Sequence, residues 1–181
     1  MDSVLLHNDT RKIYKDNAIV AATNKMTLIE QRLLLLAIAK IDPRQSIPCP
    51  LIIRADDYAE TFGLPLDGCY KALKSATEKL FTRQIVALDN ETGFDKLHWL
   101  SRARYVAQNA TAHLYFSQEI EPYLVNLQGQ FTKYELKRIA RLNSVHSIRL
   151  FELLQRFKKN GYYTVSLDEF RDLMGLSAGY A

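Results

Sequence analysis

One pattern of apolar, acidic and turn residues occurs twice in this chain of 181 residues, with the copies 112 positions apart. The copies align when Gly63-Leu64 is placed on Gly175-Leu176. The other matched pairs are Ile53 with Val165, Asp56 with Asp168, Asp57 with Glu169, Tyr58 with Phe170, Glu60 with Asp172 and Phe62 with Met174. Because charge, aromatic and turn positions all agree, the chain is predicted to contain two related modules.

An apolar helix is predicted upstream of each copy. Thr27-Leu28-Ile29-Glu30 has the form of a capping box, and the apolar residues after it predict a buried helix as far as Ile41. Ser147–Lys159 shows helical spacing in front of the second copy. After the first of these helices, Leu51–Arg54 predicts a short strand.

A helix-turn-helix is predicted inside the first copy. Residues 56–62 are expected to be helical, Gly63-Leu64-Pro65 to form a turn, and Asp67 to cap a second helix that runs to about Thr82. The face of this second helix that is expected to be buried carries Tyr70, Leu73, Thr77 and Leu80.

Strands are expected after the second helix. Gln84–Asp89 and the alternating stretch Leu97–Gln108, joined by a turn at 90–93, predict a β-hairpin, and Thr111–Phe116 predicts a further strand. Ser117 is then expected to cap a helix that continues to Leu127. Thr132-Lys133-Tyr134-Glu135 has the form of another capping box.

This order of elements predicts an α+β fold in which a winged-helix domain, with the hairpin as its wing, is followed by the incomplete start of a second related winged-helix module. We expect residues 1–25 to form an N-terminal arm that leads into an edge strand, and 26–130 to form the first domain. Residues 131–181 are expected to hold a linking helix and the truncated second module, because only five residues follow Leu176.

Several classes of protein are excluded by composition and motifs. The longest apolar run, Leu33–Ala39, has seven residues against the roughly 20 that cross a bilayer, so we expect no membrane partner and a cytoplasmic location. The two cysteines, Cys49 and Cys69, are expected to be free thiols. No nucleotide-binding loop, HExxH pair or His-x-His pair is present. The sequence therefore predicts no catalytic residue, metal site or cofactor.

Positive charge is concentrated toward the end of the chain. Residues 131–181 hold nine of the 24 Lys and Arg but only five of the 20 Asp and Glu, which favours a polyanionic partner. The alternative interpretation is a set of solvated helix faces. The candidate DNA-binding residues are Lys71, Lys74, Lys79, Arg83, Arg102, Arg104, Arg138 and Arg141. The first two turns of the second helix carry no Arg, Asn or Gln, so that helix is expected to contact phosphates more than bases.

Three segments resemble the replication initiator proteins of iteron-containing bacterial plasmids, which are tandem winged-helix proteins. Residues 28–35 (LIEQRLLL) are similar to the opening buried helix of that family, and residues 58–64 (YAETFGL) to its first helix and turn. Residues 131–136 (FTKYEL) with 147–154 (SIRLFELL) resemble its inter-domain segment. The resemblance covers about Lys15 to Leu176.

The resemblance implies a bacterial protein that binds double-stranded DNA at plasmid origin repeats as a monomer to start replication, and that recruits the host replication initiator and helicase. It also implies a homodimer that represses its own promoter at an inverted repeat. The first module would supply the dimer interface and contacts to the DNA backbone. Pairing of exposed strands is expected to form that interface. Its candidate residues are Trp99, Tyr105, Val106, Leu114 and Phe116.

Two alternatives remain. A winged-helix transcriptional regulator without a role in replication would share the first module, but it has no need of the second copy. A nicking replication enzyme would require a tyrosine nucleophile beside a metal site, for which the sequence offers no ligand cluster.

Overall fold

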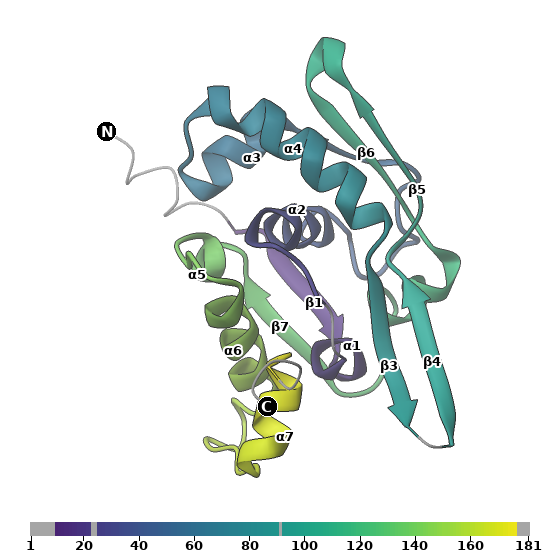
Figure 1. Cartoon of the computed structure of the whole chain (residues 1–181), viewed down its shortest axis with the longest axis vertical. Coiled ribbons are helices and arrows are strands. Elements are labelled where there is room, and N and C mark those ends of the chain that lie inside the picture. Colours follow the sequence, from purple (N-terminus) through teal and green to yellow (C-terminus); the bar gives the residue numbers. More distant parts are fainter. Residues whose placement is uncertain (1–9, 23–24, 91, 177–181) are drawn as a thin grey trace.

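The structure is a computed structural model that describes residues 10–22, 25–90 and 92–176. Helix α2 (Leu28–Ile38) lies at the centre (Figure 1). On one side of it lie α3 (Ala55–Phe62) and α4 (Leu66–Phe81), and on the other lie β1 (Lys12–Asp16) and β7 (Phe131–Glu135). The predicted capping box is confirmed, because Thr27 Oγ1 accepts from Glu30 N while the Glu30 carboxylate accepts from Thr27 N. Every residue from Glu30 to Ala39 is buried. The helix ends earlier than Ile41, because the amides of Lys40 and Ile41 bond to carbonyls three residues back.

The helix-turn-helix is confirmed, with one correction at its second helix. Helix α3 spans Ala55–Phe62 and α4 spans Leu66–Phe81. Gly63 between them has φ +61°, the left-handed conformation that glycine adopts without strain. Asp67 was expected to cap α4, but the N-cap is Pro65, which places Asp67 inside the first turn. The predicted buried face is also wrong at Tyr70, which is exposed and replaced in the buried stripe by Cys69 and Ala76.

A hairpin directly follows α4 and a strand covers Thr111–Phe116, as predicted, but the hairpin ends at His98 and the later strands form a separate sheet. Strand β3 (Gln84–Asn90) pairs with β4 (Gly93–His98) in a separate two-stranded sheet. Strands β5 (Leu100–Val106) and β6 (Thr111–Phe116) pair with each other, and β6 also pairs with β2 (Leu51–Arg54), giving the order β2-β6-β5. The expected single strand Leu97–Gln108 is therefore wrong, and the β5–β6 hairpin takes the place of the wing.

The chain changes sheets at Trp99, whose side chain is 1% exposed. The Trp99 carbonyl accepts from Ser117 N at 3.0 Å, and the His98 carbonyl accepts from Ser117 Oγ at 2.6 Å. Ser117 therefore fixes this crossing with its hydroxyl rather than capping a long helix. The segment that follows is the short 3-10 helix η3 (Gln118–Tyr123), which contains Pro122 and ends before the predicted Leu127.

The beginning of the described chain is joined to a segment more than 100 residues away. Strand β1 (Lys12–Asp16), the expected edge strand, pairs with β7 (Phe131–Glu135), and α1 (Asn17–Ala21) follows it. The capping box expected at Thr132 is wrong, because this segment is a strand and only α5 (Lys137–Ala140) is helical. The division at residues 25 and 130 stays a prediction.

The second copy of the repeat begins as predicted. Helices α6 (Val145–Arg156) and α7 (Leu167–Leu173) precede Gly175, which has φ +72°. In the first copy Leu64 N donates to the Ala59 carbonyl, and in the second Leu176 N donates to the Arg171 carbonyl, again 112 positions on. The two helix ends thus share one hydrogen-bond pattern. Within the described residues, no helix has the length and apolar character that crossing a membrane requires.

Candidate nucleic-acid interface

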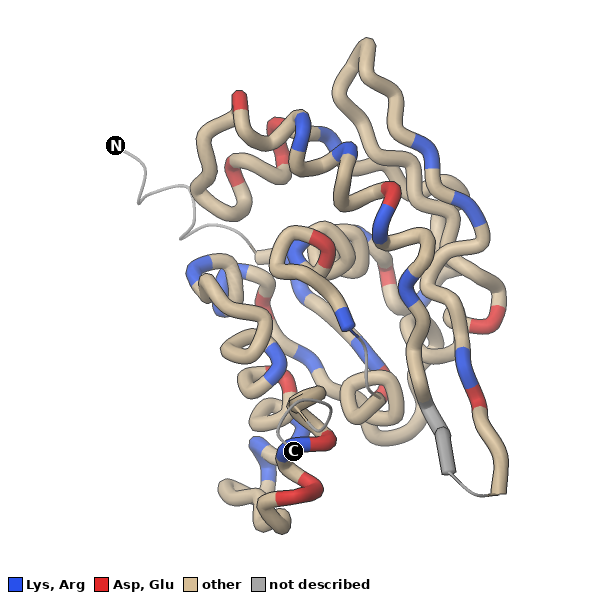
Figure 2. Tube along the Cα trace, in the orientation of Figure 1, with Lys and Arg blue, Asp and Glu red and all other residues tan. Residues whose placement is uncertain are grey.

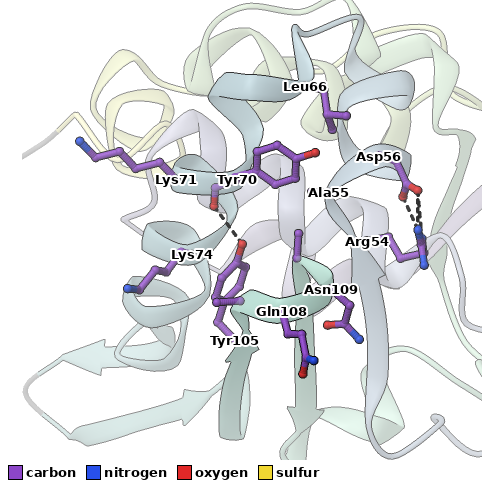
Figure 3. A pocket seen from close by; sticks show the side chains of 12 residues that line it. Arg54, Ala55, Asp56, Leu66, Tyr70, Lys71, Lys74, Tyr105, Gln108 and Asn109 are labelled. Atoms are coloured by element: carbon purple, nitrogen blue, oxygen red, sulfur yellow. Dashed lines mark hydrogen bonds and ion pairs between the residues drawn. The ribbon is translucent and has the colours of Figure 1, made fainter.

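A groove of about 690 Å³ lies between the first half of α4 and the turn that joins β5 to β6. This turn consists of the 3-10 helix η2 (Ala107–Asn109) and Ala110. Helix α4 packs on β5, and Tyr105 of β5 donates its hydroxyl to the Tyr70 carbonyl of α4 at 3.3 Å (Figure 3). This bond holds the turn beside the helix. We call the site the α4 groove and define it by Tyr70, Lys71, Lys74, Tyr105, Gln108 and Asn109.

Two predicted DNA-binding residues, Lys71 and Lys74, line the α4 groove and are exposed. The buried stripe of α4 includes Leu73 and Leu80, so the lysines lie on the side of the helix that the core leaves open. Glu78 is also exposed and lies four residues after Lys74, on the same side of the helix. The open side therefore carries the two lysines between two exposed carboxylates, Asp67 in the first turn and Glu78.

Arg54 and Asp56 form an ion pair on the rim of the groove. Arg54 Nη2 lies 2.8 Å from Asp56 Oδ2, and both side chains are more than half exposed. Hydrogen bonds from Arg54 lower the pKa of Asp56, so this carboxylate is ionised at neutral pH. The Asp56 charge is thus partly balanced by a cation that belongs to the same rim.

The structure does not bring Arg102 and Arg104 together with the lysines of α4. Tyr105 faces α4, and neighbouring side chains of a strand point to opposite faces of its sheet, so both arginines lie on the far face of β5. Their cross-strand partners are Tyr115 and His113. The Arg102 guanidinium lies 5.0 Å from the Tyr115 ring centre, so it contacts an aromatic ring and not a carboxylate.

The two remaining DNA-binding candidates near α4, Lys79 and Arg83, have different surroundings. Lys79 is exposed in the last turn of α4. The Arg83 guanidinium instead forms a bidentate pair with Glu30, at 2.8 and 3.0 Å, and the Glu30 side chain is fully buried. The hydrogen bonds that Arg83 donates to Glu30 raise the pKa of Arg83. In this structure Arg83 is therefore held by the core helix α2.

The predicted arginines of the later segment, Arg138 and Arg141, are exposed at α5. Arg138 lies 3.8 Å from Glu135, which also contacts Lys137. Figure 2 shows Lys and Arg both along α4 and along the α5–α6 segment, which lie on different sides of α2. The basic residues thus form separate groups rather than one continuous stripe.

Two of the five predicted dimer-interface residues are corrected by their burial. Trp99 is 1% exposed and Leu114 is 0% exposed, so both side chains pack inside their own chain and have no surface for a partner. Tyr105, Val106 and Phe116 are partly exposed. Strand β5, which carries Tyr105 and Val106, is an edge strand of its three-stranded sheet.

Sequence reasoning missed Gln108 and Asn109, two exposed amide side chains beside the lysines of the α4 groove. The sequence predicts Gln108 as the last residue of the strand Leu97–Gln108, and it leaves Asn109 between that strand and Thr111–Phe116. The signal that marks them is the pair of strands on either side, since a hairpin turn carries its side chains to the edge of the sheet. Among the described residues, no three His, Cys, Asp or Glu side chains form a group that could hold a metal ion.

The core helix, the helix-turn-helix and the three-stranded sheet with its hairpin define a winged-helix protein, a class in which helix and wing commonly contact DNA. The family model "Initiator Replication protein, WH1" matches residues 12–155. The chain therefore belongs to this family of replication initiators.

Two relatives from Escherichia coli match most of the chain. The chain is 26% identical to the Replication initiation protein of Escherichia coli over 178 residues, which cover 93% of this chain and 55% of that protein. It is 25% identical to the PI protein of Escherichia coli, with 91% and 63% covered. The chain thus spans between half and two thirds of the length of these relatives.

A solved structure confirms the fold. The crystal structure of the Pi initiator protein in complex with iteron DNA superposes with a TM-score of 0.79 at 24% identity. The match covers 92% of this chain and 73% of that chain.

Proposed function

We propose that this chain is part of a plasmid replication initiator that binds the repeats of a plasmid origin as a monomer and represses its own promoter as a dimer. The observation that carries the proposal is the pair of exposed lysines, Lys71 and Lys74, on the second helix of a helix-turn-helix and beside an open groove. Family membership supports the same conclusion.

The chemistry of the α4 groove favours the DNA backbone. A lysine ammonium is a point charge that binds phosphate oxygens without regard to sequence. Each lysine that neutralises a phosphate releases condensed cations, so binding should weaken steeply as salt rises. On the groove side of α4, Asp67 and Glu78 limit the cationic surface to the part of the helix around Lys71 and Lys74.

A fluorescence-anisotropy titration tests this proposal. The chain is titrated against a duplex with the origin repeats and against a scrambled duplex, at several salt concentrations. Replacing both Lys71 and Lys74 with Ala should weaken binding to both duplexes and lower the salt slope by about two units. The control is Lys12→Ala with Lys133→Ala, which removes the same charge from β1 and β7 on the other side of α2. Equal slopes in the two double variants would contradict the proposal.

We propose that the dimer forms by pairing of β5 edges. The edge position of β5, with partly exposed Val106 beside its end, supports this arrangement. Val106→Lys should then lower the mass measured by light scattering to that of one chain. The comparison variant is Ile52→Lys on β2, the opposite edge, where Ile52 is 45% exposed. Loss of the dimer only in Ile52→Lys would assign the interface to β2 instead.

The remaining parts of the proposal concern the whole protein. We propose that it acts in the bacterial cytoplasm by binding DNA without cleaving it. We also propose that it recruits the host replication initiator and helicase to the origin. Incubation of a supercoiled origin plasmid with the protein and a divalent metal should leave the plasmid uncut. Strand cleavage would favour a nicking enzyme and contradict this part of the proposal.

A further inference from the structure

We propose that Asn109 reads one A·T base pair through the minor groove, next to the phosphates held by Lys71 and Lys74. This inference rests on the proposed function and adds a base-specific contact to it. The exposed part of the first two turns of α4 holds no Arg, Asn or Gln that could bind a base edge. A base contact through an amide or a guanidinium therefore has to come from another element of the same surface.

The β5–β6 turn supplies the side chain with suitable chemistry. Asn109 is exposed and lines the α4 groove together with both lysines (Figure 3). The bond between Tyr105 and the Tyr70 carbonyl ties the end of β5 to α4, so the turn is held at a fixed place relative to the lysines. A protein that places α4 on the phosphates thus also brings the Asn109 amide to the duplex.

The Asn109 side chain is oriented by a chain of hydrogen bonds. Thr111 donates its hydroxyl hydrogen to Asn109 Oδ1 at 2.8 Å, and Thr111 is only 4% exposed. The same hydroxyl oxygen lies 3.1 Å from His113 Nε2, from which it accepts when that nitrogen carries the proton. The relay from His113 through Thr111 therefore engages the amide oxygen and leaves the Nδ2 hydrogens as the groups offered to a ligand.

A side chain that offers donors selects a base edge that offers acceptors. In the minor groove, A·T and T·A pairs present adenine N3 and thymine O2, whereas a G·C pair adds the guanine N2 amine. That amine would face the Asn109 donors and reject them. Bidentate binding of adenine in the major groove instead requires the amide oxygen, which already accepts from Thr111 with one of its two lone pairs. The minor groove of an A·T pair is the edge that fits.

The test uses base analogues that change one groove at a time. Origin duplexes are made with single A·T pairs replaced by inosine·cytosine, which keeps the minor-groove pattern of A·T, or by 2,6-diaminopurine·thymine, which adds the amine there. At the contacted position, diaminopurine should weaken wild-type binding by about tenfold, while inosine·cytosine should leave it nearly unchanged.

Two variants then assign the effect to the relay. Asn109→Ala should lose about tenfold for the natural duplex and should no longer respond to diaminopurine, with an unchanged salt slope. Thr111→Val, which keeps the shape of the buried residue, should reduce the same discrimination. Gln128→Ala is the control, since Gln128 is exposed before β7 and outside the α4 groove. Circular dichroism confirms that each variant is folded.

The outcomes separate this inference from the function on which it rests. Equal binding of the wild-type chain to origin and scrambled duplexes overturns both. If the wild-type chain discriminates between the two duplexes but Asn109→Ala still responds to diaminopurine, the inference alone is overturned. Strong loss with inosine·cytosine at the position where Asn109 acts would place the contact in the major groove and would also overturn it.

Discussion

Lys15 of β1 and Glu152 of α6 form a buried ion pair, with Lys15 Nζ 2.5 Å from Glu152 Oε1 although 137 residues separate them. Both residues are at most 5% exposed. Tyr134 of β7 donates its hydroxyl to the same carboxylate oxygen at 2.5 Å. Burial and the Glu152 charge raise the pKa of Tyr134 well above its ordinary value, so it remains a neutral donor. This cluster joins the beginning of the described chain to the helix that starts the second copy.

Breaking this ion pair from one side should destabilise the protein strongly. Glu152→Ala leaves the Lys15 ammonium buried without its counterion, and we expect a loss of about 3–5 kcal/mol in the free energy of unfolding. Urea denaturation measures this loss. Lys15→Met combined with Glu152→Leu should recover much of it, because it leaves no buried charge at either position. A single variant that unfolds at the wild-type urea concentration would contradict the assigned pairing.

Arg149 makes a second connection close to the first. Its guanidinium donates to the carbonyls of Val20 and Ala21 at the end of α1, at 2.6 and 2.9 Å, and to the Leu173 carbonyl at the end of α7, at 2.8 Å. The carbonyl ends of two helices carry partial negative charge, which a cation stabilises. The Arg149 side chain therefore binds terminal carbonyl groups of α1 and α7, two helices that lie far apart in the sequence.

Replacing Arg149 with Lys should separate α7 from α1. An ammonium group has no planar fork, so it does not satisfy carbonyls of both helices in the geometry that Arg149 uses. We expect amide hydrogen exchange in α7 to accelerate by at least about tenfold, since hydrogen bonds to charged groups are worth about 1.5–3 kcal/mol each. Exchange in the central helix α2 serves as the internal reference. Unchanged protection of α7 would mean that packing alone holds it.

The sequence predicts correctly those features that depend on residues close together in the chain. The capping box at Thr27 and the glycine turns at Gly63 and Gly175 involve residues three to five positions apart, so their patterns survive in the sequence. The capping-box pattern at Thr132 failed for a tertiary reason. Lys15, Tyr134 and Glu152 form one buried cluster, and pairing with β1 makes this segment a strand.

The candidate site was predictable only in part. The lysines of α4 follow from helical spacing, because their exposure depends on one element. The position of Arg83 depends on Glu30, which lies 53 residues earlier, and the alignment of Asn109 with the lysines depends on how the hairpin packs. Burial of Trp99 and Leu114 likewise results from packing of the whole domain. Local periodicity carries no information about such distant contacts.

Arg83→Ala should affect stability and leave the salt dependence of DNA binding unchanged. The substitution leaves the fully buried Glu30 carboxylate without its guanidinium partner, and we expect a loss of about 2–3 kcal/mol because the Arg83 side chain is 31% exposed. Thermal denaturation measures the loss, and the anisotropy titration provides the salt slope. A slope lower by about one unit would instead assign a phosphate contact to Arg83.

Asp57 should make stability fall as the pH drops below about 4. Burial opposes ionisation of Asp57, but hydrogen bonds from Lys40 and Arg11 outweigh it and lower the pKa below its ordinary value. A carboxylate with a lowered folded-state pKa stabilises the protein above its unfolded pKa, about 3.9, and loses this contribution as pH falls through the folded pKa. Asp57→Asn should therefore cost about 1 kcal/mol at pH 7 and less at pH 2. Urea denaturation between pH 7 and pH 2 measures both values, and a constant difference across that range would show that the Asp57 charge does not contribute.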